Sequence, residues 1–341
     1  MSLWYSLVRN YVRVGLSLYF RKIQVIGTSN IPSTGPVMFT INHQNAFLDA
    51  LLVATTNKRL SHFLVRADVF KFRIVRKFFS TLNMMPVYRI RDGRSSLINN
   101  HQIFERCFAV LQQQQAIMLF PEANHHQKRL LLPLSKGFTR IALGAEEPIL
   151  IVPVGINYTH HRLMGGSVSV YYGKPVSTEG FVHGDAKDHR KLTDQVKKVM
   201  QELIASIPDD EHYQQYEDYL NQDRWQYLDP DHCNRWIQKT TPQSIPRVSA
   251  ETSAGFIRNL AKAISASLNF FPILVNKTVL DKLNDPVFSS SIKFLSGIMI
   301  LPVYYLVMTL LLLYFAGPNI ALMMVGLGIF SLFARKQTLR Y

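Results

Sequence analysis

Residues 23–205 alternate between short apolar runs and longer segments in which apolar side chains recur at helical spacing. The short runs are bounded by glycine and proline, as buried strands commonly are, and cover residues 37–41, 117–120, 150–154 and 167–172. The longer segments predict helices over residues 49–57, 68–80, 95–114, 136–145 and 186–206. Strands that alternate with helices predict an α/β domain, residues 23–237, with a mixed, mostly parallel sheet flanked by helices.

Residues 1–22 predict a separate amphipathic helix at the N-terminus. Apolar residues, including Trp4 and Tyr11, recur at roughly helical spacing, and four basic side chains lie among them. A basic amphipathic helix with such aromatic side chains suits the interfacial zone of a bilayer. A helix that packs on the protein core would show the same pattern, so both interpretations stay open.

The C-terminal part of the chain predicts a membrane hairpin. Residues 238–292 are expected to form a linker and a helical region, and residues 293–341 the hairpin with a basic tail. No charged side chain occurs in the 41 positions between Lys293 and Arg335, and Gly317-Pro318-Asn319 divides this run. The first half is long enough to span a bilayer, and the basic flanks place both ends in the cytoplasm. A hairpin buried within a soluble protein is the alternative.

The composition favours a membrane over nucleic acid as partner. The chain has 38 Lys and Arg against 23 Asp and Glu, a net charge of +15, which attracts either kind of anionic surface. A hydrophobic content of 48% with 11% aromatics is high for a nucleic-acid-binding domain. The sequence also lacks zinc-finger spacing, an RNP-type aromatic motif and a clear helix-turn-helix, so we expect no nucleic-acid partner.

The charge is unevenly distributed along the chain. Residues 57–94 carry ten basic and two acidic side chains, whereas residues 209–235 carry eight acidic side chains and two arginines. We interpret the basic stretch as a surface that faces a membrane or an anionic substrate, with a merely solvated face as the alternative. The acidic stretch is interpreted as a solvated face.

The cysteines and the N-terminus indicate a reducing compartment. Cys107 and Cys233 lie far apart without a partner motif, so neither a disulfide framework nor a thiolate metal site is expected. The first residues show no basic region followed by an apolar core and a cleavage site, so we expect no signal peptide.

One histidine stands where a catalytic base would stand. His43 follows the predicted strand 37–41, and Asp49 comes six residues later. An imidazole can accept and return a proton near neutral pH, and a carboxylate can hold one ring nitrogen so that the other points at a substrate hydroxyl. By itself such a pair often occurs by chance.

Three further sequence blocks follow in order, and together they make a chance pairing of His43 and Asp49 a poor explanation. They are Met85-Pro86-Val87-Tyr88-Arg89, Leu119-Phe120-Pro121-Glu122-Ala123-Asn124 leading to Lys136-Gly137, and Ile151-Val152-Pro153-Val154-Gly155. Together with Asn42-His43-Gln44-Asn45-Ala46-Phe47-Leu48-Asp49, the array resembles the four motifs of the PlsC-like glycerolipid acyltransferases. The resemblance covers residues 25–175, roughly half of the chain.

This resemblance implies a mechanism and a fold of the glycerolipid acyltransferase type. His43 would be the general base on an acceptor hydroxyl that attacks an acyl thioester, and Asp49 would orient it. The co-substrate would be acyl-CoA or acyl carrier protein, with no cofactor, metal or covalent acyl-enzyme. The sequence agrees, because it contains neither a Gly-x-Ser-x-Gly elbow nor a His-Glu-x-x-His motif.

The resemblance also implies substrate-binding residues. Arg89 would bind the acceptor's phosphate with its permanently charged, multi-donor head group. Glu122 would bind or order the acceptor site, and Lys136 and Gly137 would contribute to it. Each has a plainer alternative: a solvated charge for Arg89, a helix-start carboxylate for Glu122, and the start of a helix for Lys136 and Gly137.

The chain departs from the usual pattern in two places. Five residues separate the histidine and aspartate instead of the usual four, which requires a different loop path and marks a subgroup. In the third block Ala123 replaces the usual glycine, and His125 stands at the usual arginine position. Lys128 or Arg129 is predicted to supply the lost charge. These departures leave the acceptor open.

We therefore expect a membrane-bound enzyme of phospholipid biosynthesis that works on the cytoplasmic face, at the inner membrane if the source is bacterial. Its partners would be the lipid bilayer, the acyl donor, and lysophosphatidate or glycerol 3-phosphate as acceptor. The first alternative is an O-acyltransferase for another lyso-lipid, such as an aminolipid. The second is a catalytically silent, membrane-anchored binding protein.

Overall fold

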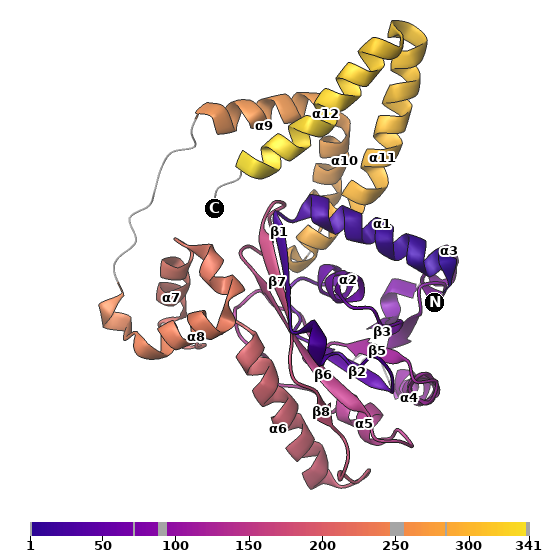
Figure 1. The fold of residues 1–341 in the computed structure, drawn as a ribbon, viewed down its shortest axis with the longest axis vertical. Coiled ribbons are helices and arrows are strands. Elements are labelled where there is room, and N and C mark those ends of the chain that lie inside the picture. The colour runs from indigo at the N-terminus through magenta and orange to yellow at the C-terminus, as the bar shows by residue number, and fades with distance from the viewer. Residues whose placement is uncertain (1, 71, 88–93, 246–255, 284, 339–341) are drawn as a thin grey trace.

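An eight-stranded sheet forms the centre of the protein in the computed structural model, which describes residues 2–70, 72–87, 94–245, 256–283 and 285–338 (Figure 1). The strand order is β1-β7-β6-β2-β5-β3-β4, with β8 paired to β6. The strands are β1 (Lys22–Ile26), β2 (Val37–Ile41), β3 (Ser61–Arg66), β4 (Met84–Val87), β5 (Ala116–Leu119), β6 (Leu150–Tyr158), β7 (Ser167–Tyr172) and β8 (Val176–Ser177). All described pairings are parallel except those of β6 with β7 and β8, so the predicted mixed, mostly parallel sheet is confirmed.

The four predicted strands are the central ones, and the strands that the pattern missed lie mainly towards the edges. β2 and β7 have the predicted bounds, β5 is shifted by one residue, and β6 continues to Tyr158. The unpredicted β1 and β4 form the two edges of the sheet. β1 is partly exposed and β4 contains Pro86, so neither shows the continuous apolar run of a strand covered on both faces.

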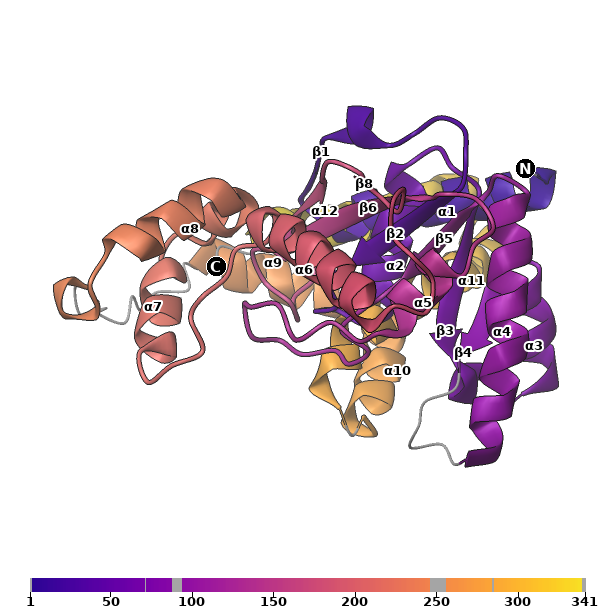
Figure 2. The ribbon, with the colours of Figure 1, turned by 90° about the horizontal axis from the view of Figure 1, so that it is seen from below.

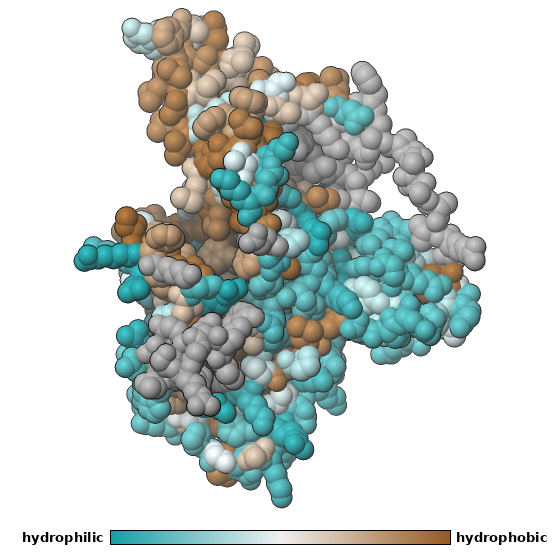
Figure 3. All heavy atoms as spheres, turned by 180° about the vertical axis from the view of Figure 1, so that it is seen from behind, coloured by the Kyte–Doolittle hydropathy of each residue, from teal (hydrophilic) through white to brown (hydrophobic). Residues whose placement is uncertain are grey.

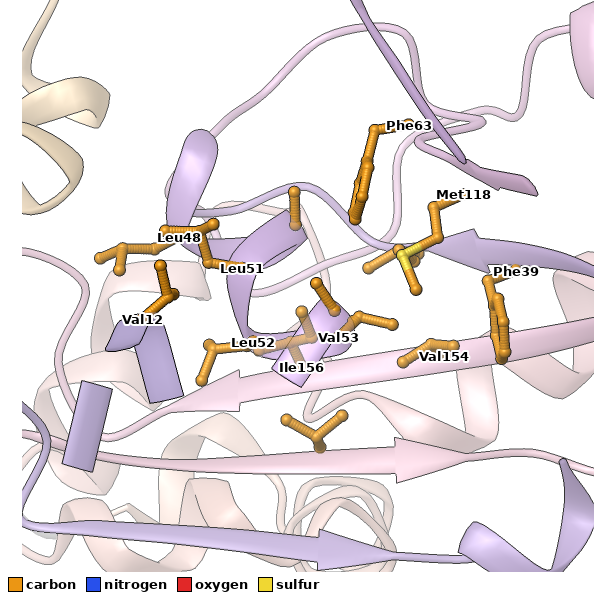
Figure 4. Packing of buried hydrophobic residues seen from close by; sticks show 14 of the residues in the cluster. Val12, Phe39, Leu48, Leu51, Leu52, Val53, Phe63, Met118, Val154 and Ile156 are labelled. Carbon is orange, nitrogen blue, oxygen red and sulfur yellow. The ribbon is translucent and has the colours of Figure 1, made fainter. Parts of the chain in front are cut away.

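Helices cover both faces of the sheet. On one face lie α1 (Leu3–Tyr19) and α2 (Phe47–Thr56), and on the other lie α4 (Arg94–Gln112), α5 (Gly137–Leu143) and α6 (Ala186–Leu203) (Figures 1 and 2). β2 shows the result, because Phe39 packs towards α2 while Met38 packs towards the other helices, and all five of its residues are buried. Leu48 and Leu52 of α2 pack in the same cluster as Phe39 (Figure 4).

The predicted helices of the α/β domain are confirmed, with one divided in two. Residues 68–80 form the short 3₁₀ turn Ala67–Phe70 and α3 (Arg73–Ser80). For α1 the structure shows packing on the protein core, one of the two interpretations that the sequence left open, and contact with a bilayer stays a prediction. Val12 and Leu16 are buried, whereas Leu3, Leu7 and Val14 remain largely exposed.

The acidic stretch forms a small helical lobe beside the sheet (Figures 1 and 2). It consists of α7 (Tyr213–Leu220), the 3₁₀ turn Arg224–Leu228 and α8 (Pro230–Lys239), which enclose a core of their own. Tyr216, Leu220, Tyr227, Cys233 and Ile237 are among the buried residues of that core. Its acidic side chains lie mostly on the outside, as a solvated face requires.

Four helices make up the C-terminal part, namely α9 (Phe256–Leu268), α10 (Phe270–Asp281), α11 (Ser289–Ala316) and α12 (Pro318–Thr338). α11 and α12 form the predicted hairpin, and Gly317 makes the turn at φ +84°. α9 packs on α12 and α10 packs on α11, so these helices form one unit with the hairpin. The expected hairpin boundary at 293 falls inside α11, and much of the expected linker lies outside the described residues.

The hairpin projects from the sheet and presents apolar side chains to the outside (Figures 1 and 3). The helix Pro286–Ala316 is long and apolar enough to cross a membrane, and its most apolar 18-residue window is 0% buried against the rest of the described chain. α12 is apolar over a shorter stretch, Pro318–Ala334. A hairpin buried within a soluble protein is therefore not what the structure contains.

Candidate active site

The histidine and the aspartate of the first block meet at the end of β2. His43 follows the strand, and Asp49 lies in the first turn of α2. His43 Nδ1 lies 3.0 Å from Asp49 Oδ2. Because a carboxylate only accepts, Nδ1–H donates this bond and Nε2 carries the free lone pair. Nε2 makes no hydrogen bond within the described part of the chain, and the side chain is 16% exposed. The longer spacing thus still forms the dyad.

Asp49 is completely buried, and its two carboxyl oxygens accept three hydrogen bonds. Besides the imidazole, the Asn45 backbone N–H donates to Oδ2 at 2.8 Å and the Tyr158 hydroxyl to Oδ1 at 2.6 Å. Burial, followed by the negative charge of Asp49, raises the pKa of Tyr158 well above its usual range, so its proton remains available for donation. These bonds fix the carboxylate, and the ring of Phe120, stacked on His43 at a centroid distance of 3.9 Å, fixes the imidazole.

Ala46 provides the loop path that the extra residue needs. The Leu48 N–H donates to the Asn45 carbonyl at 3.1 Å, which closes a turn with Ala46 at φ 46° and ψ −122°. Glycine adopts this conformation readily, whereas side chains with a Cβ are strained in it. Ala46 is also the residue before α2 and has no side-chain oxygen with which to cap that helix. The dyad therefore depends on a strained turn.

We expect Ala46→Gly to retain activity and stability, because relief of backbone strain offsets the greater freedom of glycine in the unfolded chain. Ala46→Val should lower kcat at least about tenfold and destabilise the protein by about 1–3 kcal/mol, because a β-branched residue resists positive φ. Ala54→Val is the matched control, since it adds the same methyl groups at another buried position of α2. Equal kcat and melting temperature in Ala46→Val and Ala54→Val would contradict the strained turn.

Glu122 of the third block hydrogen-bonds to the backbone of His43. Its side chain is completely buried. Oε1 accepts the His43 backbone N–H at 2.7 Å, and Oε2 accepts the Leu132 N–H at 2.8 Å and His126 Nε2–H at 3.1 Å. The His126 N–H also donates to the His43 carbonyl, so both backbone groups of His43 bond to the third block. Of the two roles that the sequence allowed, this geometry favours ordering of the site over contact with a substrate.

The remaining predicted substrate-binding residues are placed less directly. Arg89 lies outside the described residues. Lys136 is exposed and Gly137 begins α5, which is the plainer of the two roles considered for this pair. The Ser135 N–H donates to the Pro121 carbonyl at 2.8 Å, so this segment does lie beside the third block. Substrate contact by Lys136 and Gly137 stays a prediction.

Arg129 does not restore the missing charge of the third block. Its guanidinium is buried, donates from Nη1 to the Tyr158 carbonyl at 2.8 Å, and lies 3.3 Å from the ring centroid of Tyr227. It therefore joins the helical lobe to the sheet, because a buried guanidinium needs fixed acceptors around it. Lys128 remains exposed and pairs with Asp209 of the acidic stretch at 2.5 Å. Arg59 of the basic stretch is likewise buried on backbone carbonyls and faces no membrane.

The other departures of the third block also have a structural explanation. Ala123 adopts φ 57°, the left-handed conformation that explains why glycine is usual there. His125, at the usual arginine position, donates from Nε2 to Asp285 Oδ2 at 2.8 Å, just before α11. The pKa of the Asp285 carboxyl is lowered, and this hydrogen bond is the largest cause. The ring of His125 meets that of His43 edge-on at 5.6 Å.

Sequence reasoning missed two groups that the fold brings to the dyad. Tyr158 lies four residues beyond the predicted end of β6, on the same side of the strand as Val154 and Ile156. The alternation of Val154, Ile156 and Tyr158 along the chain was the one sequence signal that could have extended β6 to Tyr158. Ser291 comes from α11 and contacts the turn of Ala46, and no local pattern connects these two positions.

Comparison with known proteins agrees with this geometry. The model of the family described as Acyltransferase matches residues 22–157, which contain β1 to β5, β6 except its last residue, and both members of the dyad. A glycerol-3-phosphate O-acyltransferase 2 of Saccharomyces cerevisiae is 26% identical over 190 residues, 53% of this chain and 25% of the relative. Residues 22–157 thus match the Acyltransferase family, and this part of the chain is similar to glycerolipid acyltransferases.

Two further acyltransferases are similar to parts of this chain. The chloroplastic 1-acyl-sn-glycerol-3-phosphate acyltransferase LPAT1 of Arabidopsis thaliana is 27% identical over 157 residues, 46% of this chain and 42% of the relative. The crystal structure of the 1-acyl-sn-glycerophosphate acyltransferase PlsC from Thermotoga maritima is 22% identical, with a TM-score of 0.44 over 57% of this chain and 76% of that one. The matched stretches span less than half the length of the Saccharomyces cerevisiae enzyme and of LPAT1.

Proposed function

We propose that this protein transfers a fatty acyl group from a thioester, acyl-CoA or acyl carrier protein, to a hydroxyl of lysophosphatidate or glycerol 3-phosphate in phospholipid biosynthesis. The observation that carries the proposal is the free Nε2 of His43, opposite an Nδ1–H that is held by the buried Asp49. Names of the relatives support this acceptor class, because they are glycerol-3-phosphate and 1-acylglycerol-3-phosphate acyltransferases.

The chemistry follows from the free nitrogen. Nε2 accepts the proton of the acceptor hydroxyl while its oxygen attacks the thioester carbonyl. Asp49 stabilises the imidazolium that forms. When the tetrahedral intermediate collapses, the C–S bond breaks and Nε2–H returns the proton to the thiolate. The sum is one ester formed and one thiol released, and we propose that it needs no metal, cofactor or acyl-enzyme.

We propose that Arg89 binds the phosphate of the acceptor, because a guanidinium matches two phosphate oxygens. One observation favours a second candidate, an acyltransferase for another lyso-lipid such as an aminolipid. The position that usually carries an arginine holds His125, whose Nε2–H donates to the Asp285 carboxylate. At this position the chain therefore has no guanidinium to meet a second phosphate oxygen.

An acceptor panel tests these functions with the purified full-length protein. Glycerol 3-phosphate, lysophosphatidate and a lyso-aminolipid are each incubated with palmitoyl-CoA or palmitoyl-acyl carrier protein, and the esterified lipid is measured. We expect transfer to a phosphate-bearing acceptor. Transfer to the aminolipid alone would favour the second candidate, and no transfer with any pair would favour the catalytically silent binding protein.

We propose that the protein works at a membrane, with its active site on the cytoplasmic face. The exposed apolar surface of α11 and α12 supports insertion, and the exposed residues of α1 supply a second apolar surface. α3 adds basic and apolar side chains, because Arg73, Lys77, Phe72 and Ile74 are all exposed around it. The basic residues on both flanks of the hairpin favour the cytoplasmic orientation.

Charges placed on the outer surface of the hairpin should release the protein from membranes. Val303, Leu306 and Leu310 are each about three-fifths exposed (61%, 60% and 59%). Lysine at each of them costs about 2.5–3.5 kcal/mol at the centre of a bilayer. We expect the triple lysine variant to appear in the soluble fraction after high-salt washing, and the triple alanine variant at the same positions to sediment with membranes. Sedimentation of both variants would contradict insertion of the hairpin.

A further inference from the structure

The start of α11 contacts each of the three loops that build the active site. These loops follow β2, β5 and β6, which are neighbours in the sheet. The first carries the dyad, the second carries Glu122, and the third follows Tyr158. Residues 285–293 hydrogen-bond to all three, although more than 120 residues of sequence separate them from the nearest.

The most direct of these contacts is the hydroxyl of Ser291. It donates to the Asn45 carbonyl at 3.0 Å and accepts the Leu48 N–H at 3.1 Å, so it bridges the two ends of the turn of Ala46. Ser291 is 2% exposed. Since Ala46 has no oxygen to cap α2, the hydroxyl of a distant helix occupies the place of the missing cap.

Ser290 braces the same turn through the third loop. Its hydroxyl donates to the His161 carbonyl at 2.6 Å, and that carbonyl also accepts Asn45 Nδ2–H at 3.0 Å. Lys293 donates from Nζ to the Arg162 carbonyl at 2.8 Å. Asn45 also donates its backbone N–H to Asp49, so hydrogen bonds of this one residue join the His161 carbonyl, which Ser290 contacts, to the carboxylate of the dyad.

The second loop is joined through His125 and Asp285. The ring of His125 lies between Phe288, at a centroid distance of 4.9 Å, and His43, at 5.6 Å. Its bond to Asp285 holds it in that place. The root of the hairpin therefore reaches both members of the dyad indirectly. It reaches Asp49 through Asn45 and His43 through His125.

We propose that residues 285–291, the root of the apolar hairpin, are positioning residues for the His43–Asp49 dyad. Ser291 holds the strained turn that sets the Nδ1 to Oδ2 distance, so the helix that enters the membrane also sets the catalytic geometry. This inference rests on the proposed function. Its physical basis is that a strained backbone conformation persists only when several contacts hold it in place. The turn has local hydrogen bonds but no side-chain cap for α2, and Ser291 supplies that cap from a distant helix.

The test is Ser291→Ala in the full-length protein, assayed by thiol release from palmitoyl-CoA with glycerol 3-phosphate and with lysophosphatidate. We expect kcat to fall about tenfold to a hundredfold with KM changed less than about twofold, because the loss is in orientation and not in substrate contact. Ser296→Ala is the matched control on the same helix, since its hydroxyl bonds only to carbonyls of α11 itself and should leave kcat unchanged.

A second measurement tells a loss of dyad positioning apart from a general loss of folded structure. In a His43→Ala background, adding Ser291→Ala should lower the residual rate no further, because the hydroxyl acts through the dyad. An equal loss in both backgrounds, or an unchanged kcat in Ser291→Ala, overturns the inference while the proposed function stands. A wild-type protein that releases no thiol with either acceptor, from palmitoyl-CoA or from palmitoyl-acyl carrier protein, overturns the proposed function itself.

Discussion

Replacing His43 with alanine is expected to lower kcat at least about a thousandfold while the protein stays folded and bound to membranes. In the proposed mechanism the imidazole takes the proton from the acceptor hydroxyl, and general base catalysis of this kind contributes about 10²–10⁴ to the rate. Asp49→Asn should be nearly as damaging, because the amide can donate to Nδ1 and so favour the tautomer in which Nε2 carries the proton. Both rates are measured by thiol release with the best acceptor of the panel.

The controls for this prediction come from the same chain. His101→Ala removes an exposed histidine of α4 and should leave kcat unchanged. The melting temperature of His43→Ala should stay close to that of the wild type, since the ring is stacked on Phe120 but donates only one side-chain hydrogen bond among the described residues. Retained transfer in a folded His43→Ala variant would remove the base from the mechanism.

Glu122→Gln is expected to lower kcat about a hundredfold and the free energy of unfolding by about 3 kcal/mol. The carboxylate accepts from His43, Leu132 and His126, and all three donors are directed at it. An amide of the same shape can accept at one oxygen only, so its NH₂ group must face at least one N–H in a buried site. Chemical denaturation gives the stability and thiol release gives kcat.

Glu146→Gln is the matched control for Glu122→Gln, because it makes the same chemical change on an exposed side chain. A Glu122→Gln variant that is as stable as the wild type would show that the three bonds do not hold the loop. A variant that is destabilised but fully active would separate the fold from the dyad. KM for the acceptor should change little, because the carboxylate has no exposed surface.

The sequence predicted the central strands and the dyad because both depend on local chemistry. β2 and β6 are covered on both faces, and such strands must be apolar at nearly every position, which the chain shows directly. The edge strand β1 is partly exposed, so its pattern resembles that of a loop, and the other edge strand, β4, has only four residues and contains Pro86. The long uncharged run likewise predicted the hairpin, but not that α9 and α10 pack against it.

Charge was a less reliable guide than apolar pattern. Arg129 and Arg59 look like surface cations in the sequence, yet both are buried on backbone carbonyls. Whether an arginine reaches solvent depends on which carbonyls the fold leaves without partners around it, and that is a property of distant segments. The same reason explains why Lys128 meets Asp209 of the acidic lobe.

The sequence by itself determined the chemistry of the site: a histidine after a buried strand, a carboxylate six residues on, and a second carboxylate after another strand. Only the tertiary structure decided how these groups are held. β2 lies between β5 and β6, so the loops that follow these three strands converge, and Glu122, Tyr158 and Ser291 reach the dyad from distant parts of the chain. Strand order and helix docking arise from the packing of the whole chain, and no local spacing encodes them.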